Sequence, residues 1–303
     1  MGKRLMGCTP QELLSLSPDE LFEALKGSEG RCVYACARCK GPNLVQGVTN
    51  AEVCASMGAD LVKLCYYDPY DPYFPGLPSK DPKDDEAYAN VQLPLGRGWT
   101  AREIRSLIGR PVSVEMFVEQ ASEERMDKMI SEGFDIICIY GFEYDEDFLP
   151  KISRLAEKCK GKALVEAGIL HGPKLKEVPT HMKDLQTAEF AAKAVKAGAN
   201  LFQVPAVGTL PGFNEAYVTN LIEAIHEAGG LAITGIHSSM EGSKTDLIHR
   251  IAVDNKICGA DIQMIGDAGI NENMADPELI MELSIAMKGK RHTYRRMCVS
   301  LNR

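Results

Sequence analysis

The sequence has no apolar run longer than a β-strand, whereas a helix that crosses a membrane needs about 20 apolar residues. Basic residues are not in excess either, because 34 Lys and Arg stand against 42 Asp and Glu, which argues against a general nucleic-acid binder. Ten cysteines in 303 residues are too few for a disulfide scaffold and are expected to be reduced thiols. The first residues also lack the apolar stretch of a signal peptide. These absences predict a cytoplasmic protein without membrane or nucleic-acid partners.

A pattern of Gly, apolar residue, Asp or Asn, and apolar residue recurs along the chain. It begins at Gly58, Gly133, Gly198 and Gly259. Each glycine closes an amphipathic stretch, as a left-handed residue after a helix does, and each pattern leads into a short apolar run typical of a buried strand. The repeated unit is therefore helix, glycine and strand.

Further apolar runs and helical patterns complete an alternation of strand and helix. The other predicted strands are residues 32–36, 111–116, 162–167 and 231–236, and the predicted helices are 50–57, 100–108, 122–132, 146–160, 187–197, 214–228, 244–258 and 276–288. Eight alternations predict one α/β domain over residues 1–303, a (β/α)8 TIM barrel, with an extra helix at 17–26 inside an N-terminal cap of residues 1–30. An open doubly wound sheet is the alternative. The first turn lacks that fold's Gly-rich motif, so we expect no nucleotide cofactor.

Two predicted loops are unusually long, and a basic tail follows the last helix. Residues 66–99, after the second strand, are rich in aromatics and prolines, which suits either a stiff lid over the barrel mouth or a subunit contact in a homo-oligomer. The second loop, 169–186, carries two histidines and several lysines. The tail, 289–303, is interpreted as a solvated helix end or as a segment that reaches an anionic ligand or a neighbouring subunit.

Polar residues occur late in nearly every predicted strand, where barrel enzymes place their active sites. They are Lys63, Glu115, Tyr140, Glu166, Gln203, His237 and Asp267. A charged side chain that pointed outward would be buried under a helix, so we expect these side chains to point into the barrel. Glu115, Glu166, His237 and Lys63 are the predicted acid, base or electrostatic groups. Glu115, Glu166 and Asp267 are candidate ligands of Mg2+ or Mn2+.

Two other interpretations of these charged residues stay open. One is an interior ion-pair network that includes Lys63. The other is a Schiff base between Lys63 and a carbonyl substrate, since a buried lysine loses its proton readily.

Small and hydroxyl residues follow the seventh and eighth strands, where barrels commonly bind phosphate through backbone N–H groups. The candidate anion-binding residues are Ser238, Ser239, Gly242, Ser243, Gly266 and Gly269, with Lys244 nearby.

Cys32, Cys36 and Cys39 form a C-x3-C-x2-C pattern, which matches the cluster motif of radical SAM enzymes. The alternative is a set of small buried residues, with Cys36 and Cys39 as reactive thiols near the barrel mouth.

The run from Gly47 to Glu52 and the run from Met57 to Val62, with the ending 291–296, resemble an uncharacterised group of bacterial barrel proteins. The group is similar to BtpA-like barrels, and its members carry labels such as phosphoenolpyruvate phosphonomutase-like and dehalogenase-like hydrolase. The resemblance implies the barrel fold and supplies no catalytic residues.

The sequence therefore predicts an enzyme that acts on a small phosphorylated or carboxylated metabolite. The expected chemistry is that of a lyase or aldolase, or of an isomerase or epimerase, through acid–base groups with assistance from a divalent metal. The alternatives are a non-catalytic metabolite-binding regulator and a radical SAM enzyme.

Overall fold

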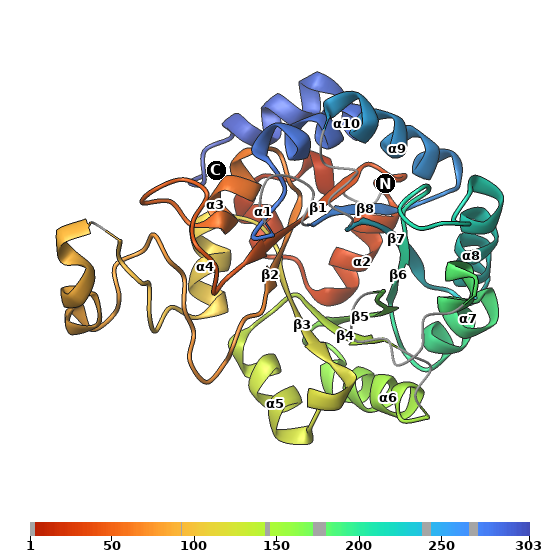
Figure 1. Ribbon diagram of the computed structural model, residues 1–303, viewed down its shortest axis with the longest axis horizontal. Helices are drawn as coiled ribbons and strands as arrows, with labels where there is room; N and C mark the ends of the chain where they lie inside the picture. The colour runs from red at the N-terminus through yellow and green to blue at the C-terminus, as the bar shows by residue number, and fades with distance from the viewer. Residues whose placement is uncertain (1–3, 92, 143–145, 172–179, 238–243, 267–271) are drawn as a thin grey trace.

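The computed structural model describes residues 4–91, 93–142, 146–171, 180–237, 244–266 and 272–303. Its eight parallel strands close in sequence order into a barrel, which confirms the predicted fold (Figure 1). The strands are β1 (Cys32–Arg38), β2 (Leu61–Cys65), β3 (Val112–Phe117), β4 (Ile136–Gly141), β5 (Leu164–Ile169), β6 (Leu201–Pro205), β7 (Leu231–Ile236) and β8 (Ile262–Ile265).

Helices surround the barrel at the predicted places. They are α3 (Asn50–Ser56), α4 (Ala101–Ile108), α5 (Glu123–Glu132), α6 (Phe148–Cys159), α7 (Ala188–Lys196), α8 (Glu215–Glu227), α9 (Thr245–Ile257) and α10 (Pro277–Cys298). Short elements precede or interrupt them: η1 (Leu5–Gly7), α1 (Pro10–Leu14), α2 (Pro18–Lys26), η2 (Pro82–Val91), η3 (Val118–Gln120) and η4 (Met182–Leu185). Among the described residues, no helix combines the length and apolarity that a membrane crossing needs.

The recurring glycine pattern has the same structural role at each occurrence. All its glycines have positive φ, between 83° and 116°, which a residue without Cβ adopts at little cost. The Asp or Asn two positions later then accepts a hydrogen bond from a backbone N–H at the start of the preceding odd-numbered strand. These bonds are Val33 N to Asp60 (3.0 Å), Val112 N to Asp135 (2.8 Å), Val165 N to Asn200 (2.9 Å) and Ala232 N to Asp261 (2.8 Å). The repeat thus ties the strands together in pairs at the N-terminal end of the barrel.

The N-terminal helices close that same end. Apolar side chains of α1 and α2, including Leu13, Leu21 and Leu25, share one buried cluster with Leu61 and Ile262 from the barrel interior. Figure 1 shows α2 lying across the ring of strands. A second, larger cluster fills the space between the strands and the outer helices. The N-terminal end is therefore packed shut, and any ligand site must lie at the other end.

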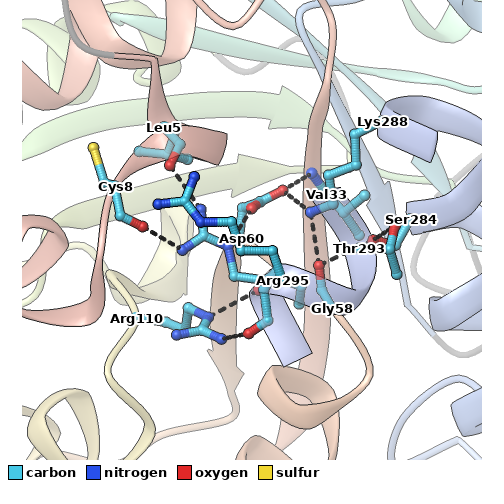
Figure 2. A network of polar contacts seen from close by, with 12 residues as sticks. Leu5, Cys8, Val33, Gly58, Asp60, Arg110, Ser284, Lys288, Thr293 and Arg295 are labelled. Carbon is cyan, nitrogen blue, oxygen red and sulfur yellow. Dashed lines mark hydrogen bonds and ion pairs between the residues drawn. The ribbon is translucent and has the colours of Figure 1, made fainter. Parts of the chain in front are cut away.

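A buried ionic network fastens the C-terminal helix to this closed end. Asp60 accepts a hydrogen bond from Lys288 (Figure 2). It also accepts one from Arg296 Nε at 2.9 Å. Lys288 also donates to Gly58 O at 2.8 Å, and Arg110 donates to Arg296 O at 2.8 Å. Helix α10 runs past residue 288 after a non-helical Gly289, so part of the basic segment 289–303 is helical and contributes a buried arginine.

The long segment 66–99 leaves the barrel wall between β2 and α4. Its base is anchored, because buried Tyr67 packs edge-on against Phe134 and donates to Glu132 at 2.7 Å. Farther along, Figure 1 shows the orange to yellow chain, which carries η2, projecting sideways beyond α4. The projecting part is held by its own polar contacts, such as those of Asp85 with Ser79 and with the N–H of Leu95.

Candidate functional site

A cavity of about 470 Å³ opens at the C-terminal end of the barrel. Its polar and charged lining includes Arg38, Lys63, Cys65, Tyr66, Glu115, Tyr140, His171, Gln203, His237 and Glu272. Strand alternation explains the members that lie on strands, because every second residue of each parallel strand points into the barrel, whereas Tyr66, His171, His237 and Glu272 follow strands. The sequence-predicted Lys63, Glu115, Tyr140, Gln203, His237 and Gly266 all line this one cavity.

Lys63, which lines the cavity, forms an ion pair with Glu166, which lies beneath it. Lys63 Nζ lies 2.7 Å from Glu166 Oε1, and the two side chains are 1% and 0% exposed. Burial alone would lower the pKa of Lys63, but neighbouring Cys138 and Glu166 raise it well above its usual value. Lys63 is therefore an ammonium at neutral pH, which favours the ion-pair interpretation over a Schiff base, because imine formation needs the neutral amine.

Glu166 does not line the cavity. Besides Lys63, its carboxylate contacts Tyr140, accepts from Tyr34 at 3.1 Å and accepts from the Cys138 thiol at 2.9 Å. Both oxygens are thus engaged by side chains of the barrel interior. The geometry makes Glu166 the counter-ion that fixes Lys63 and leaves it no direct contact with a ligand in the cavity.

A chain of hydrogen bonds leads from this ion pair to His237. Lys63 donates to the Tyr140 hydroxyl, whose single proton lies between Glu166 Oε1 and Gln203 Oε1, the latter 2.6 Å away. Gln203 Nε2 lies 2.8 Å from His237 Nε2. Since the amide nitrogen of Gln203 donates, His237 Nε2 accepts, and Nδ1 carries the proton of the neutral ring. Burial, with smaller effects of Lys63 and His171, lowers the pKa of His237 to about 3. His237 is therefore neutral across the physiological range and presents an N–H donor.

Glycines at the strand ends make room for this ring. A Cβ on Gly235 would lie 2.7 Å from His237 Nε2 and 2.9 Å from Gln203 Nε2. A Cβ on Gly266 would lie 2.6 Å from His237 Nδ1. Gly266, predicted from sequence as an anion-binding residue, is thus required sterically by the histidine.

Glu115 lies on the β3 side of the cavity and is partly exposed. Its Oε1 accepts a long hydrogen bond from Tyr66 N, at 3.4 Å. Burial raises the pKa of Glu115, and the positive charge of Lys63 opposes that rise without cancelling it. A carboxylate with a raised pKa in a ligand-sized cavity has the properties of a general base.

Arg38, Tyr66 and Glu272 form the mouth of the cavity. Arg38 is the last residue of β1, and its guanidinium lies 4.9 Å from the centre of the Tyr66 ring. Arg38 Nη1 also contacts Glu272 Oε2 at 2.9 Å. Tyr66 has a φ of 58°, which is unusual for a residue with a Cβ and is typical of functional positions.

Several predicted site residues fall outside the described part of the chain. They are Ser238, Ser239, Gly242, Ser243, Asp267 and Gly269. Glu115 lines the cavity, whereas Glu166 does not and is engaged by Lys63 and its neighbours, so their assignment as metal ligands with Asp267 stays a prediction. Among the described residues, no group of three His, Cys, Asp or Glu side chains could hold a metal ion, so we derive no step through Mg2+ or Mn2+.

The three cysteines of the C-x3-C-x2-C pattern do not converge. Cys32 lies at the N-terminal end of β1, and four residues of strand, roughly 13 Å, separate it from Cys36. Cys36 lines the cavity, whereas Cys39 is buried in the cluster between barrel and helices. The structure thus contradicts a shared iron–sulfur cluster and shows small buried residues instead.

Sequence reasoning missed Arg38, Tyr66 and Glu272 as cavity residues. Arg38 is the last residue of its strand, and Tyr66 directly follows one, so both belong to the positions where barrel sites are expected. Nothing in the sequence pattern indicated the left-handed backbone of Tyr66 that brings its ring beside Arg38.

Comparison with solved structures supports the fold. The carboxyl transferase domain of pyruvate carboxylase from Rhizobium etli, in a structure with 3-bromopyruvate, has a TM-score of 0.50 and 15% identity. The match covers 95% of this chain and 52% of that chain. A variant of the same domain with pyruvate gives a TM-score of 0.51 and 14% identity, with the same coverage. The chain therefore spans about half the length of these structures, and identities this low show the barrel architecture alone.

No curated protein matches the sequence. One protein family does, over residues 6–303, and it is described as a domain of unknown function. Because that match takes in nearly the whole barrel, the chain belongs to this family, DUF7916.

Proposed function

We propose that this protein is an acid–base enzyme of lyase or isomerase type that acts on a small anionic metabolite with a carbonyl group. The observation that carries the proposal is the placement of Glu115 and His237 on one cavity with the Lys63 ammonium. Glu115 comes from β3, and His237 follows β7. In a closed barrel of eight strands, β3 and β7 lie on opposite sides, so the two groups face each other across the cavity.

Each group has a distinct role in this proposal. Glu115 takes a proton from the carbon beside the carbonyl, because its raised pKa makes the carboxylate a stronger base. Lys63 stabilises the negative charge that then develops on oxygen, with the one N–H that Tyr140 and Glu166 leave it. His237 donates a hydrogen bond from Nδ1 while it stays neutral.

The test is proton exchange with solvent. The full chain is incubated in D2O with a panel of 2-oxo acids and phosphorylated aldehydes, and the 1H NMR signal beside each carbonyl is followed. Pyruvate and 3-hydroxypyruvate belong in the panel because solved structures of the similar carboxyl transferase domain contain them. We expect wild type to catalyse exchange on at least one compound and Glu115→Gln to lose it by at least roughly 100-fold.

Glu119→Gln is the matched control, since the same substitution there falls on an exposed residue outside the cavity. It should exchange like wild type. Equal exchange in Glu115→Gln would refute the assigned base. Binding of panel compounds by wild type with no exchange of any of them would refute the enzyme and favour a metabolite-binding regulator.

A further inference from the structure

We infer that Arg38 is the residue that binds the anionic group of the ligand, and that Glu272 occupies this position until the ligand displaces it. The inference rests on the proposed function and assigns recognition of the substrate's anion to a residue at the cavity mouth. The chemical class it names is a small molecule with a carboxylate or phosphate.

The described part of the cavity wall carries few positive charges. Among the described lining residues, the Lys and Arg side chains are Lys63 and Arg38. The positive charge of Lys63 is balanced by the carboxylate of Glu166, 2.7 Å away. Burial lowers the pKa of both His171 and His237, so neither carries charge at neutral pH. Arg38 is thus the described cation placed to meet an anionic ligand.

Glu272 holds Arg38 only weakly. The Glu272 side chain is 77% exposed and that of Arg38 is 29% exposed, and ion pairs this open to water contribute little. A guanidinium has five N–H donors in a planar fork, and Glu272 contacts one nitrogen, Nη1. A carboxylate or phosphate that enters the cavity can therefore form the bidentate contact that Glu272 does not make.

Contacts on either side fix the position of the Arg38 guanidinium. Its Cζ lies over the Tyr66 ring, 4.9 Å from the ring centre. The backbone N–H of Arg38 donates to Asn273 O at 2.7 Å, which brings the segment with Glu272 beside the end of β1. Tyr66 reaches this position through its left-handed backbone, while its own N–H contacts Glu115. The binding residue and the proposed base are thus linked through one tyrosine.

The experiment measures binding rather than turnover, so it stands apart from the test of the enzyme. Inorganic phosphate and oxamate are titrated separately into the full chain by isothermal titration calorimetry, at low chloride. Oxamate represents the carboxylate source and phosphate the phosphorylated one, and the probe that binds more tightly identifies the class. Wild type should bind at least one of them.

Substitutions at the mouth then decide the assignment. Arg38→Met should weaken binding of the preferred probe at least tenfold, which corresponds to about 1.4 kcal/mol of binding free energy. Arg38→Lys keeps the charge without the planar guanidinium, so its affinity should lie between those of wild type and Arg38→Met. Glu272→Gln removes the competing carboxylate and should tighten binding by roughly threefold to tenfold. Tyr66→Gly removes the ring at a backbone angle that glycine tolerates, and it should weaken binding.

Arg97→Met is the matched control, because Arg97 is an exposed arginine that pairs with Asp71 and does not line the cavity. It should bind like wild type. Unchanged affinity in Arg38→Met, weaker binding in Glu272→Gln, or no binding of either probe to wild type would each overturn the inference. Loss of binding in Arg38→Met together with unaltered proton exchange in Glu115→Gln would leave the anion site standing while refuting the proposed base.

Discussion

Asp60 and Lys288 form an ion pair in which both side chains are 0% exposed, although one lies directly before β2 and the other in α10. Removal of one member of such a buried pair leaves a charge without a partner, which destabilises a protein by about 3–5 kcal/mol. Asp60→Asn should therefore lower the melting temperature by at least ~5 °C, at about 2 °C per kcal/mol. Differential scanning calorimetry measures this shift. Glu189→Gln, in the exposed pair with Lys193, should leave the melting temperature nearly unchanged.

The same aspartate predicts a pH dependence of stability. Burial opposes ionisation of Asp60, but Lys288 and Arg296 outweigh it and lower its pKa below the usual value. A lowered folded-state pKa means that the stabilisation is complete above the unfolded-state pKa, about 3.9, and is lost as the pH falls through the lower folded-state value. Urea unfolding of wild type and Asp60→Asn should show a constant difference from about pH 5 to 7. A difference that did not shrink below about pH 4 would contradict this assignment.

The Lys63–Glu166 pair predicts a strong double-mutant coupling. Glu166→Gln leaves the Lys63 ammonium buried without its counter-ion and should lower the free energy of unfolding by about 3–5 kcal/mol. Lys63→Met on that background removes the charge and should recover much of the loss. Chemical denaturation of both single variants and the double variant closes the cycle. Additive losses would show that the two side chains do not depend on each other.

His237 is predicted to be neutral with its proton on Nδ1. Long-range 1H–15N NMR of labelled protein distinguishes the two tautomers, and the ring signals should stay unchanged down to about pH 4, because the pKa of His237 lies at about 3. His226 is an internal reference, since its contact with Asp261 raises its pKa above the usual value. Titration of His237 near pH 6.5, the usual histidine value, would be incompatible with the hydrogen-bond chain.

The raised pKa of Glu115 predicts the pH below which proton exchange is lost. As a base it must be ionised, and its raised pKa shifts the loss of proton exchange to a pH above 4.5, the ordinary value for glutamate. The pH profile of the exchange rate in D2O measures this pH, after the usual correction for deuterium. The raised pKa results chiefly from burial and is opposed by the Lys63 charge, so the exchange that remains in a folded Lys63→Met variant should be lost at a still higher pH.

The barrel could be predicted from sequence because its signals are local and periodic. Glycine after each amphipathic stretch marked the helix ends, and the apolar runs marked the strands. The cost of burying a charge under a helix predicted that the polar residues late in the strands point into the barrel, and Lys63, Glu115, Tyr140 and Gln203 do line its cavity.

Depth within the barrel was not predictable. Alternation tells which side of a strand a residue faces, whereas its height depends on the stagger between strands. Glu166 pairs in register with Cys138, and Gly168 pairs with Tyr140 one step nearer the mouth, so the glutamate lies below the cavity. The Arg38 and Tyr66 contact likewise depends on a single backbone angle, and the residue type does not reveal it.

The four Asp and Asn tethers of the glycine repeat divide the two ends of the barrel into different mechanical roles. Each of these side chains links an even-numbered strand to the odd-numbered strand before it, so the N-terminal end is held together in pairs of strands. The amides of Val33, Val112, Val165 and Ala232 should accordingly exchange with deuterium only when whole strand pairs separate. These four hydrogen bonds do not involve the C-terminal end of the barrel. Its loops can change in length and composition with little effect on the alignment of the strands beneath them.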